Sequence, residues 1–116
     1  MQFAQKLDQL EKRFEGLNTQ MADPAVISDA GEYRKVIKSH SELAEIVGKY
    51  REWKRAEDAL SQARMMLADG DLELRALAEE EAAHLEPELA RIEDELKILM
   101  ISFKPPTDDS LLEDRS

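Results

Sequence analysis

The chain begins with apolar residues that recur at alternating spacings of four and three. These are Phe3, Leu7, Leu10, Phe14, Leu17 and Met21. Such spacings place the residues on one face of an amphipathic helix, whereas a strand would alternate with a period of two. Asp23-Pro24 interrupts the pattern, because a residue before proline is pushed out of the helical region. We therefore predict a first helix that ends before Pro24.

A second apolar stripe predicts a long helix over residues 30–68. Its members are Tyr33, Val36, His40, Leu43, Val47, Tyr50, Trp53, Ala56, Leu60, Ala63 and Leu67. Ser28 or Asp29 can cap the start of this helix by accepting a bond from a free backbone amide. At a rise of 1.5 Å per residue the helix would be roughly 55–60 Å long, which predicts an elongated domain.

A third stripe follows the turn Asp69-Gly70-Asp71. Gly70 suits a left-handed position after a helix, and Asp71 suits the cap of the next one. The apolar positions are Leu74, Ala78, Ala82, Leu85, Leu89, Ile92, Leu96, Leu99 and Phe103. Pro87 removes one backbone hydrogen bond from this pattern, so we expect a kink or break near 83–87. Lys104-Pro105-Pro106 ends the helix.

Three stripes joined by two short turns predict an all-α fold, an elongated antiparallel three-helix bundle or helical hairpin coiled coil. We expect the helical domain to cover residues 1–103 and a polar tail or linker to cover 104–116. Residues 32–55 are net basic and residues 69–95 strongly acidic, which supports antiparallel pairing of the second and third helices.

With Gly70 as the apex of this hairpin, residues 49–55 would lie opposite roughly residues 85–91. Glu86 and Glu88 fall in that stretch, and Glu93-Asp94-Glu95 follows it. Each exposed ion pair is worth only ~0.2–1 kcal/mol, so these charges would select the register of the pairing more than they would stabilise it.

Composition excludes several classes of function. The net charge of −10 argues against direct binding of duplex nucleic acid or of an anionic membrane, since both require an excess of basic side chains. The chain has no cysteine, so neither a disulfide nor a thiolate nucleophile is available. No apolar run approaches the ~20 residues of a membrane span. We therefore expect a cytoplasmic protein without a cofactor.

The best candidate for a protein-contact patch is the basic and aromatic segment around Trp53. Its members are Arg51, Trp53, Lys54 and Arg55. The alternative, which we favour, is that Trp53 belongs to the core and that its basic neighbours pair within the chain.

The other candidate residues indicate structure rather than chemistry. His40 and His84 fit packed or solvated positions better than metal ligation, which needs three or four convergent ligands. The run Glu79-Glu80-Glu81 fits a solvated helix face. Met65-Met66 could form an adaptable binding spot, although core packing is favoured. We predict no catalytic, cofactor or metal residue, and hence no enzyme.

Several segments in order resemble the N-terminal helical domain of the bacterial class I peptide chain release factors, of the release factor 1 type. Residues 10–60 begin LEKRFEGLNTQMADPAV and contain the similar pieces EYRKV and LAEIVGKYR. The stretch ARMMLADGDLELRALAEEE (63–81) is similar to the family's acidic turn and the helix that follows. Lys104-Pro105-Pro106-Thr107-Asp108-Asp109 resembles its linker, so the resemblance covers about residues 3–109.

The resemblance implies a role in translation termination, with the ribosome or other release-factor domains as partners. The family hydrolyses peptidyl-tRNA with a Gly-Gly-Gln loop and reads the codon with a Pro-x-Thr-type tripeptide. This sequence has neither, and its four glycines are never adjacent. The resemblance therefore implies a non-catalytic domain that acts through protein contacts. The alternative is a free-standing coiled-coil adaptor or oligomerisation module descended from a release factor, for which a homodimer is plausible.

The C-terminal residues depart from the family pattern. The chain ends Leu111-Leu112-Glu113-Asp114-Arg115-Ser116, whereas the family continues into an apolar strand. Asp114 would occupy a buried position there, and burying an unpaired carboxylate is costly. This ending slightly favours a natural short or decayed paralogue over a domain cut from a longer protein.

Overall fold

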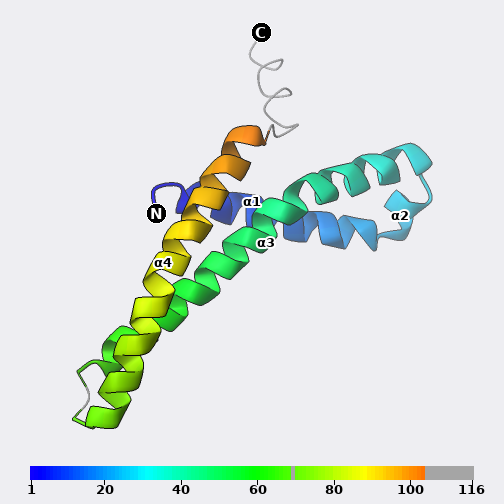
Figure 1. Ribbon diagram of the computed structural model, residues 1–116. Coiled ribbons are helices and arrows are strands. Elements are labelled where there is room, and N and C mark those ends of the chain that lie inside the picture. The colour runs from blue at the N-terminus through cyan, green and yellow to red at the C-terminus, as the bar shows by residue number, and fades with distance from the viewer. Residues whose placement is uncertain (69, 104–116) are drawn as a thin grey trace. The chain divides into compact units, whose positions relative to one another are not determined.

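The computed structural model describes residues 1–68 and 70–103, and this part of the chain is helical without a strand (Figure 1). The helices are α1 (Ala4–Met21), α2 (Pro24–Ile27), α3 (Ala30–Met66) and α4 (Leu72–Ser102). The prediction of an all-α fold is confirmed. The predicted polar tail, residues 104–116, lies outside the described residues.

The chain divides into two compact units. The first comprises Met1–Val47 together with the chain from Leu99 onward, and the second comprises Gly48–Ile98. Each unit is described by itself.

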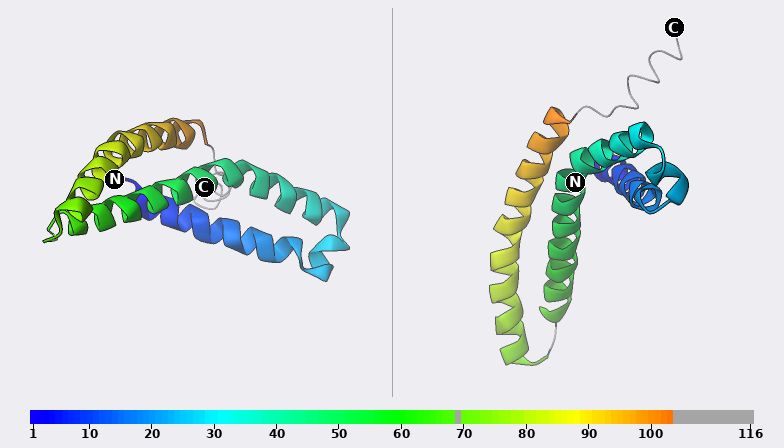
Figure 2. Two further views of the ribbon diagram at one scale, coloured as in Figure 1. Left: turned by 60° about the horizontal axis from the view of Figure 1, so that its bottom comes forward. Right: turned by 90° about the vertical axis from the view of Figure 1, so that its right-hand side faces the viewer.

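In the first unit, α1 runs antiparallel to the first part of α3 (Figures 1 and 2). The buried side chains are Leu7, Leu10, Leu17, Val36, Leu43, Ile46 and Val47. All but Ile46 belong to the predicted stripes, so the helical periodicity located this core correctly. His40 is packed as predicted: its ring stacks on Phe14 with centroids 4.5 Å apart, and its Nε2 lies 2.7 Å from Asn18 Oδ1.

The segment between α1 and α3 contains a short helix that the sequence reading treated only as an interruption. Asp23 has extended backbone angles, and its Oδ1 accepts a hydrogen bond from the N–H of Ala25 at 2.9 Å. Pro24 occupies the first helical position, where a missing N–H costs nothing. Asp29 then caps α3 by accepting a bond from the N–H of Glu32 at 3.1 Å, as predicted.

The second unit is an antiparallel helical hairpin formed by the second part of α3 and most of α4 (Figure 2). One cluster of its buried residues consists of Leu60, Ala63, Ala82, Leu85 and Leu89. Trp53, Ala56 and Ala59 pack against this cluster, and Tyr50, Ile92 and Leu96 are also buried. The antiparallel pairing predicted from the two stripes is confirmed.

The turn of the hairpin differs from its prediction at Gly70. α3 ends at Met66 rather than at residue 68, and Gly70 does not have a positive φ. The N–H groups of Leu67 and Ala68 already donate to carbonyls in the last turn of α3, at 3.2 and 3.3 Å. These bonds tighten the helix end and satisfy its carbonyls, so a left-handed residue is not required.

α4 begins at its predicted cap and continues through Pro87. Asp71 Oδ1 accepts hydrogen bonds from the N–H groups of Glu73 and Leu74, at 2.9 and 3.4 Å. Pro87 lies inside the helix, which extends to Ser102, so of the expected kink or break near 83–87 the break is wrong and the kink stays a prediction. Leu85 and Leu89 are buried on either side of the proline, and this packing supports the helix where it lacks a backbone bond.

Replacing Pro87 with Ala should therefore stabilise the fold. The exposed ring contributes little packing, and alanine restores a backbone N–H that can donate to Ala83. Proline costs up to ~3 kcal/mol in a helix interior, so we expect the free energy of unfolding to rise by about 1–3 kcal/mol. Urea unfolding followed by circular dichroism measures this change.

Ala90→Gly, at another exposed position of α4, is the matched control. It should lower stability by about 1 kcal/mol, which shows that the assay responds to helix propensity in this segment. A Pro87→Ala protein less stable than the parent would contradict our account of α4.

Candidate functional site

Trp53, the centre of the predicted contact patch, is half-buried and hydrogen-bonded. Its indole ring packs against the Leu60 cluster, and its Nε1–H donates to Glu93 Oε2 on α4 at 2.9 Å. The ring is stacked with that of the buried Tyr50, with centroids 6.1 Å apart, and Lys54 Nζ lies 4.7 Å from the centre of the Tyr50 ring. The preferred core interpretation of Trp53 therefore holds only in part, because one side of the ring stays accessible.

The four predicted contact residues do not share one face of α3. Arg51 and Arg55 are four positions apart and lie on the same side, whereas Trp53 is two positions from each of them and points elsewhere. Arg55 is exposed, and Arg51 and Lys54 are half-buried. The structure brings Trp53 and Lys54 together around Tyr50, but contact of this patch with a partner stays a prediction.

Next to the aromatic pair, five charged residues link α3 to α4. Lys49 Nζ lies 3.3 Å from Glu52 and 3.2 Å from Glu95. Arg91 pairs with Glu88, lies 2.5 Å from Glu95, and reaches Glu52 at 3.9 Å. Across the hairpin, Lys49 with Glu95 has the predicted sense, a cation of residues 32–55 with a carboxylate of 69–95, whereas Arg91 with Glu52 has the opposite sense.

This network shifts the pKa values of three of its members. The hydrogen bond to Glu95 raises the pKa of Lys49, against a smaller opposing effect of desolvation. The bond between Arg91 and Glu88 lowers the pKa of the Glu88 carboxyl and raises that of the Arg91 guanidinium. All three shifts favour the charged forms, as expected when opposite charges share hydrogen bonds.

The side-chain partners across the hairpin lie further along α4 than the predicted alignment placed them. Lys49 reaches Glu95 and Trp53 reaches Glu93, whereas the prediction placed both basic-stretch residues opposite 85–91. The reason is the direction of helical side chains, which lean toward the N-terminus of their own helix. In an antiparallel pair these leans oppose each other, so each α3 side chain meets one further along α4 than the backbone alignment indicates.

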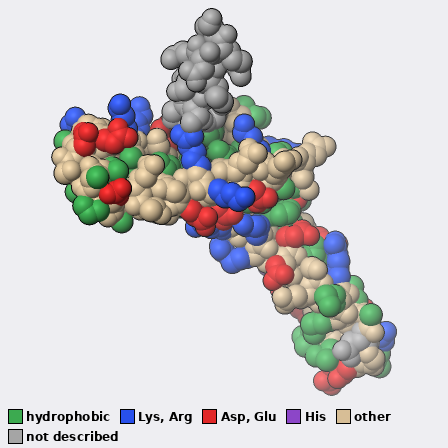
Figure 3. All heavy atoms as spheres, turned by 180° about the vertical axis from the view of Figure 1, so that it is seen from behind, with side chains coloured by type: hydrophobic (Ala, Val, Ile, Leu, Met, Phe, Trp, Pro, Cys, Tyr) green, Lys and Arg blue, Asp and Glu red, His purple; other side chains and the backbone are tan. Residues whose placement is uncertain are grey.

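The turn end of the hairpin carries exposed apolar side chains. Met65 is 74% exposed, Leu72 68% and Leu77 61%, and Met66 and Leu74 are also exposed. Hydrophobic side chains gather at this end in the space-filling view (Figure 3). The expectation that Met65-Met66 packs in the core is therefore wrong: Ala63 is the buried residue of this last turn of α3, whereas Met65 and Met66 are exposed.

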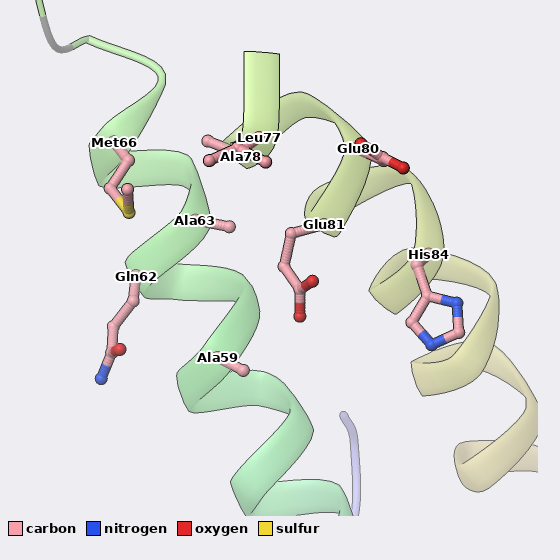
Figure 4. Close-up of a pocket in the computed structure, with 9 residues that line it drawn as sticks. All are labelled: Ala59, Gln62, Ala63, Met66, Leu77, Ala78, Glu80, Glu81 and His84. Carbon is pink, nitrogen blue, oxygen red and sulfur yellow. The ribbon is translucent and has the colours of Figure 1, made fainter. Parts of the chain in front are cut away.

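A groove of about 700 Å³ lies between the two helices near this end (Figure 4). Its apolar lining consists of Ala59, Ala63, Met66, Leu77 and Ala78. Its polar lining consists of Gln62, Glu80, Glu81 and His84. The alanines leave space between the helices, and the Glu81 side chain reaches into that space in Figure 4. Sequence reasoning missed this groove, although small residues at facing stripe positions were its visible signal.

The remaining polar candidates lie on the surface. His84 is exposed at the edge of the groove, and Glu79, Glu80 and Glu81 are exposed as expected for a solvated face. Within residues 1–68 and 70–103, no three His, Asp or Glu side chains are grouped so that they could hold a metal ion. In the same part of the chain, no helix is both long and apolar enough to cross a membrane.

Comparison with known proteins gives one consistent result. The PCRF domain family matches residues 10–112. Peptide chain release factor 1 of Acidobacterium capsulatum is 44% identical over 105 residues, which cover 90% of this chain and 29% of that protein. The proteins of the same name from Alkaliphilus oremlandii and Exiguobacterium sibiricum are 42% and 45% identical, again over 90% of this chain and 29% of theirs. The chain thus spans less than a third of these relatives. No solved structure matches it.

The half-buried position of Trp53 predicts an intermediate cost for its removal. A fully buried Trp replaced by Ala costs about 3–5 kcal/mol, so Trp53→Ala should cost about 2–3 kcal/mol here. Trp53→Phe keeps the ring but loses the bond to Glu93, and should cost about 1 kcal/mol. Thermal melts measure both changes. The exposed neighbour gives the control, since Arg55→Ala should change stability by less than about 0.5 kcal/mol. A Trp53→Ala protein that melts within a degree of the parent would contradict this account.

The charged network predicts a specific titration. Because Arg91 lowers the pKa of Glu88, this pair stabilises the fold above the ordinary carboxyl range, and the effect is lost as the pH falls through the lowered pKa. In Arg91→Gln the Glu88 carboxyl should titrate at higher pH, which carboxyl carbon chemical shifts measure directly. Lys97→Gln, which removes an exposed cation of the same helix, should leave the curve unchanged. An unchanged curve in Arg91→Gln would show that another group lowers this pKa.

Proposed function

Because this chain belongs to the PCRF domain family, we propose that it serves translation termination as a non-catalytic helical domain of the release-factor type. The observation that carries the proposal is the agreement with release factor 1 of several bacteria along 90% of the chain. We place its action in the bacterial cytoplasm, with the ribosome or other release-factor domains as partners.

The non-catalytic part of the proposal is supported by the residues that the chain offers for chemistry. No two glycines are adjacent in the sequence, so a Gly-Gly-Gln loop cannot be formed. There is no cysteine, and the chain has two histidines. His40 is engaged by Phe14 and Asn18, and His84 is exposed at the groove edge. The partners of His40 are an aromatic ring and a side-chain amide, and neither is a nucleophile that a histidine base activates.

Action through protein contacts is supported by the surface of the hairpin. The described residues bury no charged or polar side chain, so the acidic and basic groups lie at the surface. The exposed apolar side chains at the turn end offer area that a partner can bury. The net charge of −10 disfavours direct contact with RNA phosphates, so a protein surface is the better partner.

Two assays on the purified chain test this function. We expect the tagged chain to sediment with bacterial ribosomes at low salt, and full-length release factor 1 to compete with it. We expect no release of peptide from stop-codon-programmed ribosomes, because the hydrolytic loop is missing. A chain that stays in the supernatant would support the adaptor alternative, and stop-codon-dependent release would refute the non-catalytic interpretation.

A further inference from the structure

Five of the exposed large apolar side chains of the hairpin lie at its turn end, whereas Ile98 is exposed far from the turn on α4. Met65 and Met66 form the last turn of α3, and Leu72, Leu74 and Leu77 lie in the first two turns of α4. Single exposed leucines are ordinary on a protein surface, but a contiguous apolar group next to a groove marks a binding surface. Figure 3 shows this gathering at the turn end.

The dimensions of this surface fit a helix better than a small molecule. Leu74 lies three and four positions before Leu77 and Ala78, so it continues the apolar face of α4 from the groove toward the turn. From Leu74 to His84 the helix rises about 15 Å, which is close to three turns of an opposing helix. A compact ligand would fill the groove of about 700 Å³ and leave Leu74, which lies beyond the lining residues, uncovered.

The charged side chains around the groove indicate the charge that its occupant carries. Glu80 and Glu81 line it, and Glu73 and Glu79 are also exposed in the first turns of α4. Anionic lipid and nucleic-acid phosphate are repelled by such a rim, and so is the same end of a second copy of this chain. A helix with lysines or arginines beside its apolar face is attracted.

We propose that this groove, with Met66 in its lining, receives a basic amphipathic helix of a protein partner. The apolar face of that helix lies on Ala63, Met66 and Leu77, and its cations meet Glu80 and Glu81. Unbranched methionine side chains adapt to the shape of such a helix, and grooves of this kind are a recurring mode of helix recognition. The proposal rests on the protein-contact role proposed above and names the chemical class of the partner.

A labelled peptide of about 18 residues tests the proposal, with leucines at spacings i, i+3, i+4 and i+7 and lysines beside them. Fluorescence anisotropy measures its binding to the purified chain. We expect saturable binding that weakens as salt is raised, because screening shortens the range of the charge attraction. A peptide with glutamates in place of the lysines should bind at least about tenfold more weakly, since like charges then face each other.

Two variants locate the site. Leu77→Glu replaces an exposed side chain of the groove and should weaken binding about tenfold or more. Glu80→Lys with Glu81→Lys leaves the apolar lining intact and should shift preference to the glutamate peptide. Ile101→Glu is the matched control: Ile101 is 83% exposed on the same helix, 24 positions from Leu77, and its replacement should not change binding. Circular dichroism establishes that each variant is folded.

Three results would overturn the proposal. The first is no saturable binding of the basic peptide, or equal binding of both peptides. The second is an equal loss in Ile101→Glu and Leu77→Glu. The third is a concentration-dependent dimer in sedimentation velocity that Leu77→Glu abolishes, since the groove would then hold a second copy of the chain. Sedimentation with ribosomes is a separate measurement, so a failure here leaves the role in termination standing.

Discussion

The hairpin of the second unit depends on one antiparallel seam of apolar side chains. An isolated helix of ordinary composition is marginal in water, because its nucleation is unfavourable and its propensity small. α3 and α4 are therefore held by burial of residues such as Leu60, Leu85 and Leu89, each worth roughly 1.5–3 kcal/mol when removed from water. The hairpin has two helices, so each buried side chain packs against one facing helix. When such a side chain is lost, no third helix can compensate for the lost burial. The ability of α4 to continue through Pro87 follows from the same burial.

The size of the seam residues changes along the hairpin, and this gradient produces the groove. Away from the turn the buried residues of α4 are large, as Leu89, Ile92 and Leu96 show, whereas Ala78 and Ala82 take the corresponding places near the turn. Alanines bury little area and leave space between the helices, so less apolar surface holds the hairpin together there. Regions with less burial open at lower free energy. The end of the hairpin with the exposed methionines is thus also the end best able to adapt to a partner.

Sequence periodicity predicted the helices and their buried faces because burial follows the helical repeat directly. It located the stripe of Leu7, Leu10 and Leu17 and the facing positions of α3 and α4. Periodicity did not predict the segments whose conformation depends on a few local backbone hydrogen bonds. A short helix at Pro24 and a turn that does without a left-handed Gly70 both depend on where a few N–H groups find acceptors. Trp53 and Met65 were misjudged for another reason: the sequence does not give how much of a side chain its neighbours cover, and Trp53 is half-buried whereas Met65 is exposed.

The ion pairs favour one register of pairing between the two helices of the hairpin. Exposed pairs such as Arg64 with Glu86 contribute little stability, but a slipped register would separate Lys49 from Glu95 and Arg91 from Glu52. The hydrogen bond from the indole N–H of Trp53 to Glu93 also favours one register, because this N–H is the only donor of the side chain. Away from the turn, the acidic side chains of α4 thus face cations of the hairpin itself. Near the turn, Glu73 and Glu79 through Glu81 are exposed on a helix that also exposes apolar side chains. The charges that fix the hairpin and those left for recognition are therefore separated along one helix.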